Sequence, residues 1–189
     1  MSAKSKLYLQ PLGTELPLVD TQYVATSLRA FYDLEVVELA AVPLPKEAYY
    51  TPRQRYRAEK LLDTLEKIIP TDGFRILGLT AVDISTTKDG NPDWGILGLA
   101  TVDGKVCVIS AFRTQRGVNA EQARVRLAKT AVHEIGHTLG LEHCSNAGCL
   151  MQDGHGTVLT TDSEYDLCDR CRRNRSLINA ERAIPWPKP

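Results

Sequence analysis

Hydrophobic residues follow two different periods along the first half of the chain. Residues 6–12, 34–40 and 74–84 are short runs that alternate or are mostly apolar, which is typical of β-strands. Between these runs, hydrophobic residues return every three or four positions, as they do on the buried face of an α-helix. An alternating order of strands and helices favours parallel strands, right-handed connections and helices that cover the sheet. The pattern therefore predicts an α/β fold.

Local signals predict where the two intervening helices begin and end. Asp20 is a suitable N-cap for the first helix. For the second helix, Thr51 suits the N-cap, Pro52 the first helical position and Gln54 a capping box, and Pro70 ends the helix. The expected buried faces consist of Tyr23, Val24, Leu28 and Phe31 in the first helix, and of Leu61, Leu62, Leu65, Ile68 and Ile69 in the second.

A β-hairpin is predicted in the middle of the chain. Residues 94–102 and 105–112 are two strand-like runs joined by Asp103 and Gly104. An Asp-Gly pair suits a two-residue hairpin loop because both positions need a positive φ. We expect the two strands to be antiparallel, so that the sheet is mixed and one of them can be an edge strand.

Two more helices are predicted towards the C-terminus. Asn119 as N-cap and Gln122 as its capping partner begin a long helix that ends at Gly140. A capping box at Thr161–Glu164 predicts a C-terminal helix that ends before Pro185. The residues between these helices are rich in Gly and Asp, and we expect them to form a loop.

The composition is that of an ordinary globular protein. The chain has 189 residues, of which 43% are hydrophobic, enough for one domain with a conventional core. We expect a larger part, about residues 1–140, and a small C-terminal part, 141–189, with the active site between them. The 23 basic and 23 acidic side chains cancel, so the net charge does not attract nucleic acid or an anionic membrane. No apolar run could span a membrane and no signal segment is visible, so we expect a cytoplasmic location.

The predicted helix that ends at Gly140 carries a candidate metal site. His133 and His137 are four residues apart, so both imidazoles lie on one helical face. Glu134 stands beside the first histidine. Gly140 can leave the helix in the left-handed conformation, and His143 can then return to the same point. Three imidazoles leave one position of a tetrahedral zinc ion for water, as in catalytic zinc sites.

This cluster predicts metal-assisted hydrolysis. A zinc ion on three neutral imidazoles lowers the pKa of its bound water from about 15.7 towards about 7, and a nearby carboxylate can accept the proton. Glu134 is the expected general base. The alternative is that unrelated histidines share a helix face by chance. Three of the chain's four histidines lie within eleven residues, which favours the metal site.

The stretch His133–His143 resembles the zinc-binding signature of the metzincin peptidases. This resemblance extends over residues 133–171 and is closest to the archaemetzincins. It implies a metzincin-like mixed, twisted sheet with covering helices, an active-site helix and a small C-terminal zinc-binding subdomain. It also places Met151 in a tight turn beneath the metal, where it is not a ligand. The four cysteines of the pattern, which resemble a second zinc site, are Cys144, Cys149, Cys168 and Cys171.

The spacing of these cysteines supports a second zinc ion independently. Cys168 and Cys171 share a face of the predicted C-terminal helix, and Cys144 and Cys149 lie on a loop that can fold over them. Four thiolates form a closed tetrahedral site with no position for water, so its expected role is structural. Two disulfides are the alternative, which a reducing compartment disfavours. We therefore expect two zinc ions per chain. Cys107 is expected to be a buried apolar side chain.

A peptide or protein is the expected substrate, and the hairpin is expected to bind it. The segment Gly95, Ile96, Leu97 and Gly98, if it borders the cleft as in the family, can pair with an extended peptide. Its glycines permit close backbone approach, or alternatively mark a β-bulge. By the same resemblance, loop 152–160 is expected to form one wall of the pocket for the residue after the cut bond.

Two other functional classes fit part of the sequence. A protein with this fold and weak hydrolysis would be a peptide-binding module, which the complete set of catalytic residues disfavours. Nucleic acid could bind the arginines around the second cysteine pair, but interleaved aromatics are missing and Asp166 and Asp169 dilute the charge. These arginines are Arg170, Arg172, Arg173 and Arg175. The sequence therefore predicts a zinc-dependent metallopeptidase with Glu134 as general base.

Overall fold

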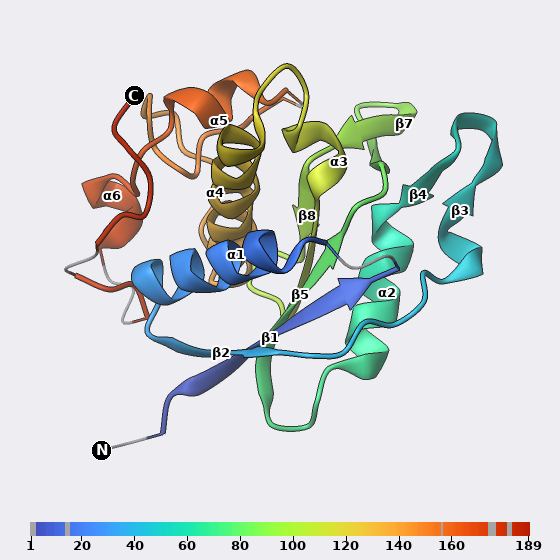
Figure 1. The fold of residues 1–189 in the computed structure, drawn as a ribbon, viewed down its shortest axis with the longest axis horizontal. Helices are drawn as coiled ribbons and strands as arrows, with labels where there is room; N and C mark the ends of the chain where they lie inside the picture. Colours follow the sequence, from blue (N-terminus) through green and yellow to red (C-terminus); the bar gives the residue numbers. More distant parts are fainter. Residues whose placement is uncertain (1–2, 14–15, 156, 174–176, 181–182) are drawn as a thin grey trace.

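A five-stranded mixed sheet forms the centre of the molecule (Figure 1). The computed structural model describes residues 3–13, 16–155, 157–173, 177–180 and 183–189. The strand order is β2-β1-β5-β9-β8, in which β8 alone runs antiparallel to its neighbour and forms one edge. The strands are β1 Ser5–Leu12, β2 Leu34–Glu38, β5 Gly73–Thr80, β8 Gly98–Ala100 and β9 Val106–Ser110. The predicted parallel order and the antiparallel edge strand are both confirmed.

Helices cover both faces of this sheet. Successive side chains of a strand point to opposite faces. Leu7 and Leu9 therefore pack with helices α1 (Leu18–Phe31) and α4 (Ala120–Thr138), whereas Tyr8 packs with α2 (Ala58–Ile68) on the other side. In β9 the same alternation directs Cys107 and Ile109 to the α4 side and Val106 and Val108 to the α2 side. Cys107 is fully buried, as expected.

A second, four-stranded sheet has the order β3-β4-β6-β7. The chain passes from β7 in this sheet to β8 in the larger sheet at Leu97, so the predicted strand 94–102 is two strands in different sheets. The predicted strand 74–84 also ends early, at Thr80, and β6 begins at Ile84. The remaining elements here are β3 Tyr49–Tyr50, β4 Arg55–Arg57, β6 Ile84–Lys88, β7 Asn91–Ile96, and the 3-10 helices η1 Lys46–Ala48 and η2 Thr51–Arg53.

The predicted helix start at Thr51 is wrong. Residues Thr51–Arg53 make only one 3-10 turn, and Gln54 follows in the left-handed conformation with a φ of 50°. The chain then forms β4, because the Tyr56 amide donates to the Asp83 carbonyl and β4 pairs with β6. Pairing with a strand far along the chain thus outweighs the local capping signal, and α2 begins at Ala58.

Helix boundaries elsewhere follow the prediction more closely. The Asn119 side chain accepts a hydrogen bond from the Gln122 amide at 2.9 Å and caps α4. Gly140 leaves this helix with a φ of 79°, as expected. Helix α1 begins earlier than predicted, with Asp20 in its first turn rather than at its cap. The end of the predicted strand 105–112 is instead the short helix α3 (Ala111–Thr114), capped by the Ser110 hydroxyl.

The predicted long C-terminal helix does not form. The described part of this region contains two short helices, α5 (Leu159–Ser163) and α6 (Asp169–Arg172). Between them the chain is extended, and the Leu150 amide donates to the Asp166 carbonyl at 3.0 Å. This extended stretch turns Cys168 back towards the loop after α4, which a continuous helix would prevent. Trp186 anchors the end of the chain by stacking on Phe31.

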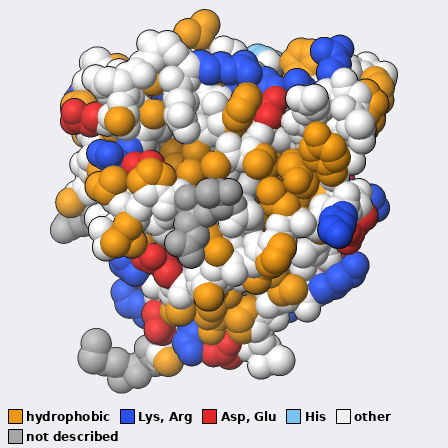
Figure 2. All heavy atoms as spheres, turned by 45° about the vertical axis from the view of Figure 1, so that its right-hand side comes forward, with side chains coloured by type: hydrophobic (Ala, Val, Ile, Leu, Met, Phe, Trp, Pro, Cys, Tyr) orange, Lys and Arg blue, Asp and Glu red, His pale blue; other side chains and the backbone are white. Residues whose placement is uncertain are grey.

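Charged groups of both signs are mixed on the surface. On the face shown in Figure 2, Lys and Arg side chains lie among Asp and Glu side chains, with hydrophobic side chains scattered between them. Among the described helices, none has the length and apolar character needed to cross a membrane.

Candidate active site

A cleft of about 500 Å³ lies beside helix α4. The edge strand β8 and the β6–β7 hairpin line one part of it, and the segment that follows α4 lines another. Three of the four predicted hydrolytic residues, His133, Glu134 and His137, enter the cleft from α4. The fourth, His143, comes from the loop just beyond Gly140. The structure thus brings all four together.

The three histidines are close enough to bind one ion. Each offers a ring nitrogen, and these nitrogens all lie within 4.8 Å of one another. The Nε2 atoms of His133 and His137 are 3.0 Å apart. Tetrahedral zinc with bonds of about 2.0 to 2.1 Å places its nitrogens about 3.4 Å apart, only slightly farther. The side chain of His143 is 49% exposed and completes the set from the solvent side.

Backbone carbonyls fix the orientation of the two helical imidazoles. Nδ1 of His133 lies 2.6 Å from the Leu150 carbonyl, and Nδ1 of His137 lies 2.6 Å from the Leu141 carbonyl. Burial, followed by the neighbouring His137, lowers the pKa of His133 to about 3, and burial also lowers the pKa of His137. Neutral rings that donate through Nδ1 have lone pairs on Nε2. Two facing lone pairs repel unless a cation lies between them, so this donor set fits a metal ion.

Glu134 is buried against the edge strand. Its side chain belongs to a residue that is 6% exposed, and burial raises the pKa of its carboxyl to about 8. A Cβ atom on Gly98 of β8 would lie 2.6 Å from Oε1 of Glu134. A glycine is therefore required at this point of β8 so that the carboxylate can occupy its position. A carboxyl with a raised pKa can accept and return a proton near neutral pH.

Met151 lies directly beneath the metal-binding helix. It is fully buried, and a Cβ atom on Gly136 of α4 would lie 2.6 Å from its Sδ atom. Gly136 is thus the point at which the helix and the methionine approach each other. A tight turn places Met151, since the Gln152 amide donates to the Cys149 carbonyl at 2.9 Å.

The four predicted cysteines form a second cluster. Their sulfur atoms lie within 4.8 Å of one another. The Cys144–Cys168 and Cys149–Cys171 sulfur distances are both 3.7 Å. Disulfides need about 2.05 Å, whereas a tetrahedral zinc ion with bonds of about 2.3 Å separates its sulfurs by about 3.8 Å. All four thiols are free, and the geometry fits a metal ion better than two disulfides.

The predicted substrate strand is only partly in the cleft. Ile96, Leu97 and Gly98 line it. Gly95 does not line the cleft, and the guanidinium of Arg113 occupies the space where its side chain would be. The two glycines therefore have different roles: Gly98 makes room for the Glu134 carboxylate, and Gly95 makes room for the Arg113 guanidinium.

The loop after Met151, which is expected to form one wall of the pocket, lines the cleft through residues 152–155 and Thr157. Residue 156 of this loop lies outside the described residues. Asp153 faces two histidines, with Oδ2 at 3.8 Å from Nδ1 of His143 and 3.4 Å from Nδ1 of His155. His155 is exposed, in agreement with its expected place in a loop.

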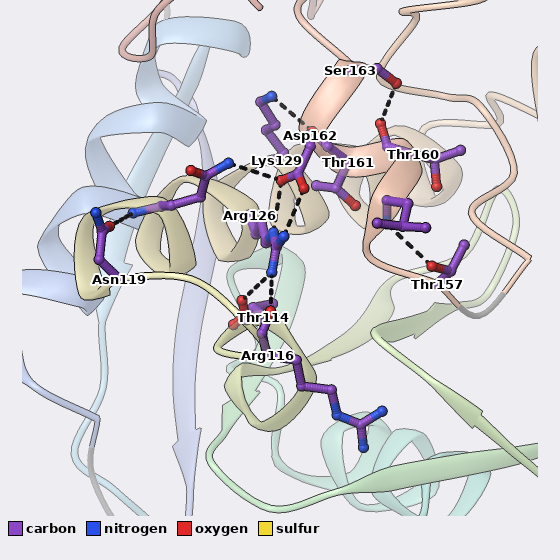
Figure 3. Close-up of polar contacts among 12 residues, drawn as sticks. Thr114, Arg116, Asn119, Arg126, Lys129, Thr157, Thr160, Thr161, Asp162 and Ser163 are labelled. Carbon is purple, nitrogen blue, oxygen red and sulfur yellow. Dashed lines mark hydrogen bonds and ion pairs between the residues drawn. The ribbon is translucent and has the colours of Figure 1, made fainter.

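Hydrogen bonds from α4 fix the helix that follows this wall. Figure 3 shows Arg126 reaching from α4 to Asp162 on α5, where Nε and Nη2 each donate to a carboxylate oxygen at 2.7 Å. Lys129, one turn further along α4, donates to the backbone carbonyls of Thr161 and Glu164. Both cations are buried. They therefore hold α5 and the residues after it against the active-site helix.

Several residues of the site are not evident from sequence. The Leu141 and Leu150 carbonyls orient the histidines, and no side-chain pattern identifies a backbone carbonyl. Thr130 and Glu164 line the cleft and were also missed. Thr130 has a usable signal, because it stands one helical turn before Glu134 on the same face. Glu164 reaches the cleft only through tertiary packing.

Comparisons with known proteins agree on one family. The model of Peptidase family M54 matches residues 23–176. Archaemetzincin of Halobacterium salinarum is 34% identical over 171 residues, which cover 86% of this chain and 95% of that protein. Archaemetzincin of Natronomonas pharaonis is 35% identical over 172 residues, with the same coverage of 86% and 95%.

Solved structures give the same result. The crystal structure of archaemetzincin from Methanopyrus kandleri has a TM-score of 0.77 and 28% identity, and the match covers 89% of this chain and 91% of that one. The structure of archaemetzincin from Archaeoglobus fulgidus has a TM-score of 0.74 and 33% identity, with coverage of 88% and 97%.

Proposed function

Because the chain belongs to Peptidase family M54, the archaemetzincins, and is a zinc metallopeptidase, we propose that it hydrolyses peptide bonds with Glu134 as general base. The observation that carries this proposal is the position of Glu134, a buried carboxyl beside three converging imidazoles. When held by His133, His137 and His143, zinc supplies a Lewis acid that polarises the scissile carbonyl and acidifies water.

The residues of the chain perform the proton transfers. Glu134 accepts the proton of the water molecule that attacks the scissile carbonyl carbon, and its carboxylate becomes a carboxylic acid. The same proton then passes to the leaving nitrogen as the C–N bond breaks, which restores the carboxylate.

The edge strand supports an extended peptide as substrate. β8 pairs with β9 on one side only, so its other edge can form backbone hydrogen bonds with a peptide. Gly98 lies on this strand and contacts Glu134. A peptide paired with β8 would therefore have its backbone next to the general base.

We also propose a structural role for the cysteine cluster, with a second zinc ion bound by Cys144, Cys149, Cys168 and Cys171. Two hydrogen bonds link this cluster to the active site. The Cys144 amide donates to the Met151 carbonyl at 2.7 Å, and Leu150, whose carbonyl orients His133, lies between Cys149 and Met151. The cluster would thus hold two parts of the site in place. One is the loop whose Leu150 carbonyl orients His133, and the other is Cys144, the residue after His143.

Cleavage profiling tests the proposed reaction. A diverse peptide library is incubated with the zinc-loaded wild type and with Glu134→Gln, and products are identified by mass spectrometry. We expect Glu134→Gln to retain its zinc and to lose about 10³-fold or more in turnover. Glu121→Gln, on the exposed first turn of α4, is the matched control and retains full activity. Turnover by Glu134→Gln at the wild-type rate would refute the mechanism. A zinc-loaded wild type that binds but does not cut peptides would indicate a binding module.

A further inference from the structure

A second buried acid lines the cleft, and the reaction proposed above does not use it. Glu164 lies in the cleft wall just after α5 and is 4% exposed. Its carboxylate accepts no hydrogen bond and forms no ion pair with any residue that the structure describes. Burial raises the pKa of this carboxyl to about 8, although nearby Lys129 lowers it. The Glu164 side chain lines the cleft, so a group that enters the cleft can bind its carboxylate.

Two cations of α4, Arg126 and Lys129, bind to α5 and the residue after it, but not to the Glu164 carboxylate. Arg126 pairs with both carboxylate oxygens of Asp162. Lys129 donates to backbone carbonyls of Thr161 and of Glu164 itself. Neither cation lies within 4.0 Å of the Glu164 carboxylate, since no such ion pair occurs among the described residues. The Glu164 carboxylate in the cleft wall can therefore accept hydrogen bonds from a ligand.

Other acids of the cleft are less suited to recognise a substrate. Asp153 faces Lys88 at 3.5 Å as well as two histidines. Glu142 is exposed, so water and salt screen its charge. Glu134 is assigned to proton transfer. Glu164 is thus the remaining buried carboxyl that lines the cleft.

Glu164 lines the same cleft as Glu134. Thr130 and Thr161 line the same cleft as Glu164. Thr130 precedes Glu134 by four residues, so the two side chains lie on one face of α4, one turn apart. A side chain that reaches this wall therefore belongs to a residue next to the bond held at Glu134.

On these grounds we propose that Glu164 is a specificity-determining residue, which selects peptides with lysine or arginine at one of the two positions that flank the cut bond. This proposal rests on the peptidase function proposed above. The cationic side chain would enter the cleft beside α4 and donate to the Glu164 carboxylate, which is a charge-assisted hydrogen bond. A neutral side chain would leave the acid buried without a partner.

Matched peptides test this assignment. They share one sequence and carry Lys, Arg, Gln, Leu or Glu at either flanking position, and kcat/KM is measured for each. For the wild type we expect Lys and Arg to exceed Gln by about tenfold at one flanking position. In Glu164→Gln this ratio falls to about one, and in Glu164→Asp, which keeps the charge, it remains above one. Glu66→Gln removes an exposed carboxylate of α2, outside the cleft, and keeps the wild-type ratio.

Binding to inactive protein separates this proposal from the proposed reaction. Fluorescence anisotropy of the same peptides is compared for Glu134→Gln and for the double variant Glu134→Gln/Glu164→Gln. The preference for Lys over Gln is expected in the first protein and lost in the second. If the wild type cuts peptides without a cationic preference, the role of Glu164 is refuted and the peptidase stands. If no peptide is cut, the reaction is refuted, and the binding ratio alone decides the role of Glu164. Equal binding of Lys and Gln peptides by Glu134→Gln also refutes it.

Discussion

The two ligand clusters of this protein lie close together in sequence but differ in exposure and in donor number. The cysteine cluster has four sulfur donors, of which three belong to buried residues. The histidine cluster has three nitrogen donors, and one of them, His143, is exposed at the side of a 500 Å³ cleft. A closed four-donor site excludes water, whereas an open three-donor site admits water and substrate. This difference agrees with the proposed roles, in which the first site stabilises the fold and the second carries out the chemistry.

One segment of the chain, residues 141–151, belongs to both clusters. Residues 141–151 contain the carbonyls that orient both helical histidines, together with His143, Cys144 and Cys149. Gly140 directs the chain into this segment and the cysteines hold its far end. If the cysteines hold this segment as proposed, the geometry of the histidine site depends on the cysteine site. Substitutions in each cluster should separate these contributions.

The largest expected effect on stability comes from the cysteine cluster. Cys168→Ser removes one of four donors, so we expect the free energy of unfolding to fall by about 3 kcal/mol or more. His143→Ala, in contrast, should lose activity and the zinc of the cleft while its melting temperature stays nearly unchanged, because His143 is exposed. Thermal unfolding and zinc analysis of both variants check this. Equal loss of stability in the two variants would contradict the proposal that the cysteine cluster, and not the histidine cluster, stabilises the fold.

Gly98→Ala should impair chemistry without impairing the fold. Its Cβ atom would lie 2.6 Å from Oε1 of Glu134, so the general base must move. We expect kcat to fall by about 10- to 100-fold, since small displacements of a catalytic group have effects of this size. Kinetics, circular dichroism and zinc content are measured together. An unchanged kcat would show that the position of Glu134 is not set by β8.

Arg126→Lys should weaken the wall of the cleft. The variant loses the paired hydrogen bonds to Asp162, and we expect a cost of about 1 to 3 kcal/mol at pH 7. Hydrogen bonding to Arg126 lowers the pKa of Asp162 below its usual 3.8. This contribution is therefore present above pH 3.8 and is lost as the pH falls below it. Denaturation at pH 7 and at pH 3 should show a smaller difference between the two proteins in acid, where only the bonds of Arg126 to the Thr114 and Arg116 carbonyls still contribute. A constant difference would contradict the assignment.

Glu164→Gln should produce an effect of opposite sign at high pH and the smallest effect at low pH. Burial raises the pKa of Glu164 to about 8 from a usual 4.5, so the folded state favours the protonated form. The wild type then loses stability as the pH rises from about 4.5 to 8. We expect the variant to match the wild type at pH 4 and to exceed it by several kcal/mol at pH 9, since one pKa unit corresponds to about 1.4 kcal/mol. Lys129, Arg126 and Asp162, the charged groups nearby, remain in both proteins. Identical pH profiles would show that the carboxyl is solvated.

Much of the site could be predicted because its signals are local. His133, Glu134 and His137 depend only on helical spacing, and the cap at Asn119 and the exit at Gly140 are local conformational preferences. The family resemblance is confirmed by Peptidase family M54 and by the archaemetzincin structures. The four cysteines are grouped as expected, although two short helices replace the long one predicted to carry a pair of them.

The remaining features depend on contacts between distant segments. At Thr51 the sequence has a complete capping signal, but no α-helix begins there, because β4 pairs with β6. Gly95 and Gly98 leave space for the side chains of Arg113 and Glu134, respectively. No pattern along the strand reveals these contacts. Glu164 is part of the cleft wall only because α5 is tied to α4. Local preferences predict elements, whereas the specificity of the site arises where elements meet.

Stepwise removal of zinc with a chelator tests the division between the two clusters most directly. Zinc content, peptide hydrolysis, thiol reactivity and melting temperature are followed in one titration of the wild-type protein. We predict that hydrolysis disappears with the first equivalent of zinc while the fold and the unreactive thiols persist. Loss of the second equivalent should expose four reactive thiols and unfold the chain. A protein that holds one zinc ion, or that loses hydrolysis and fold in the same step, would contradict this division.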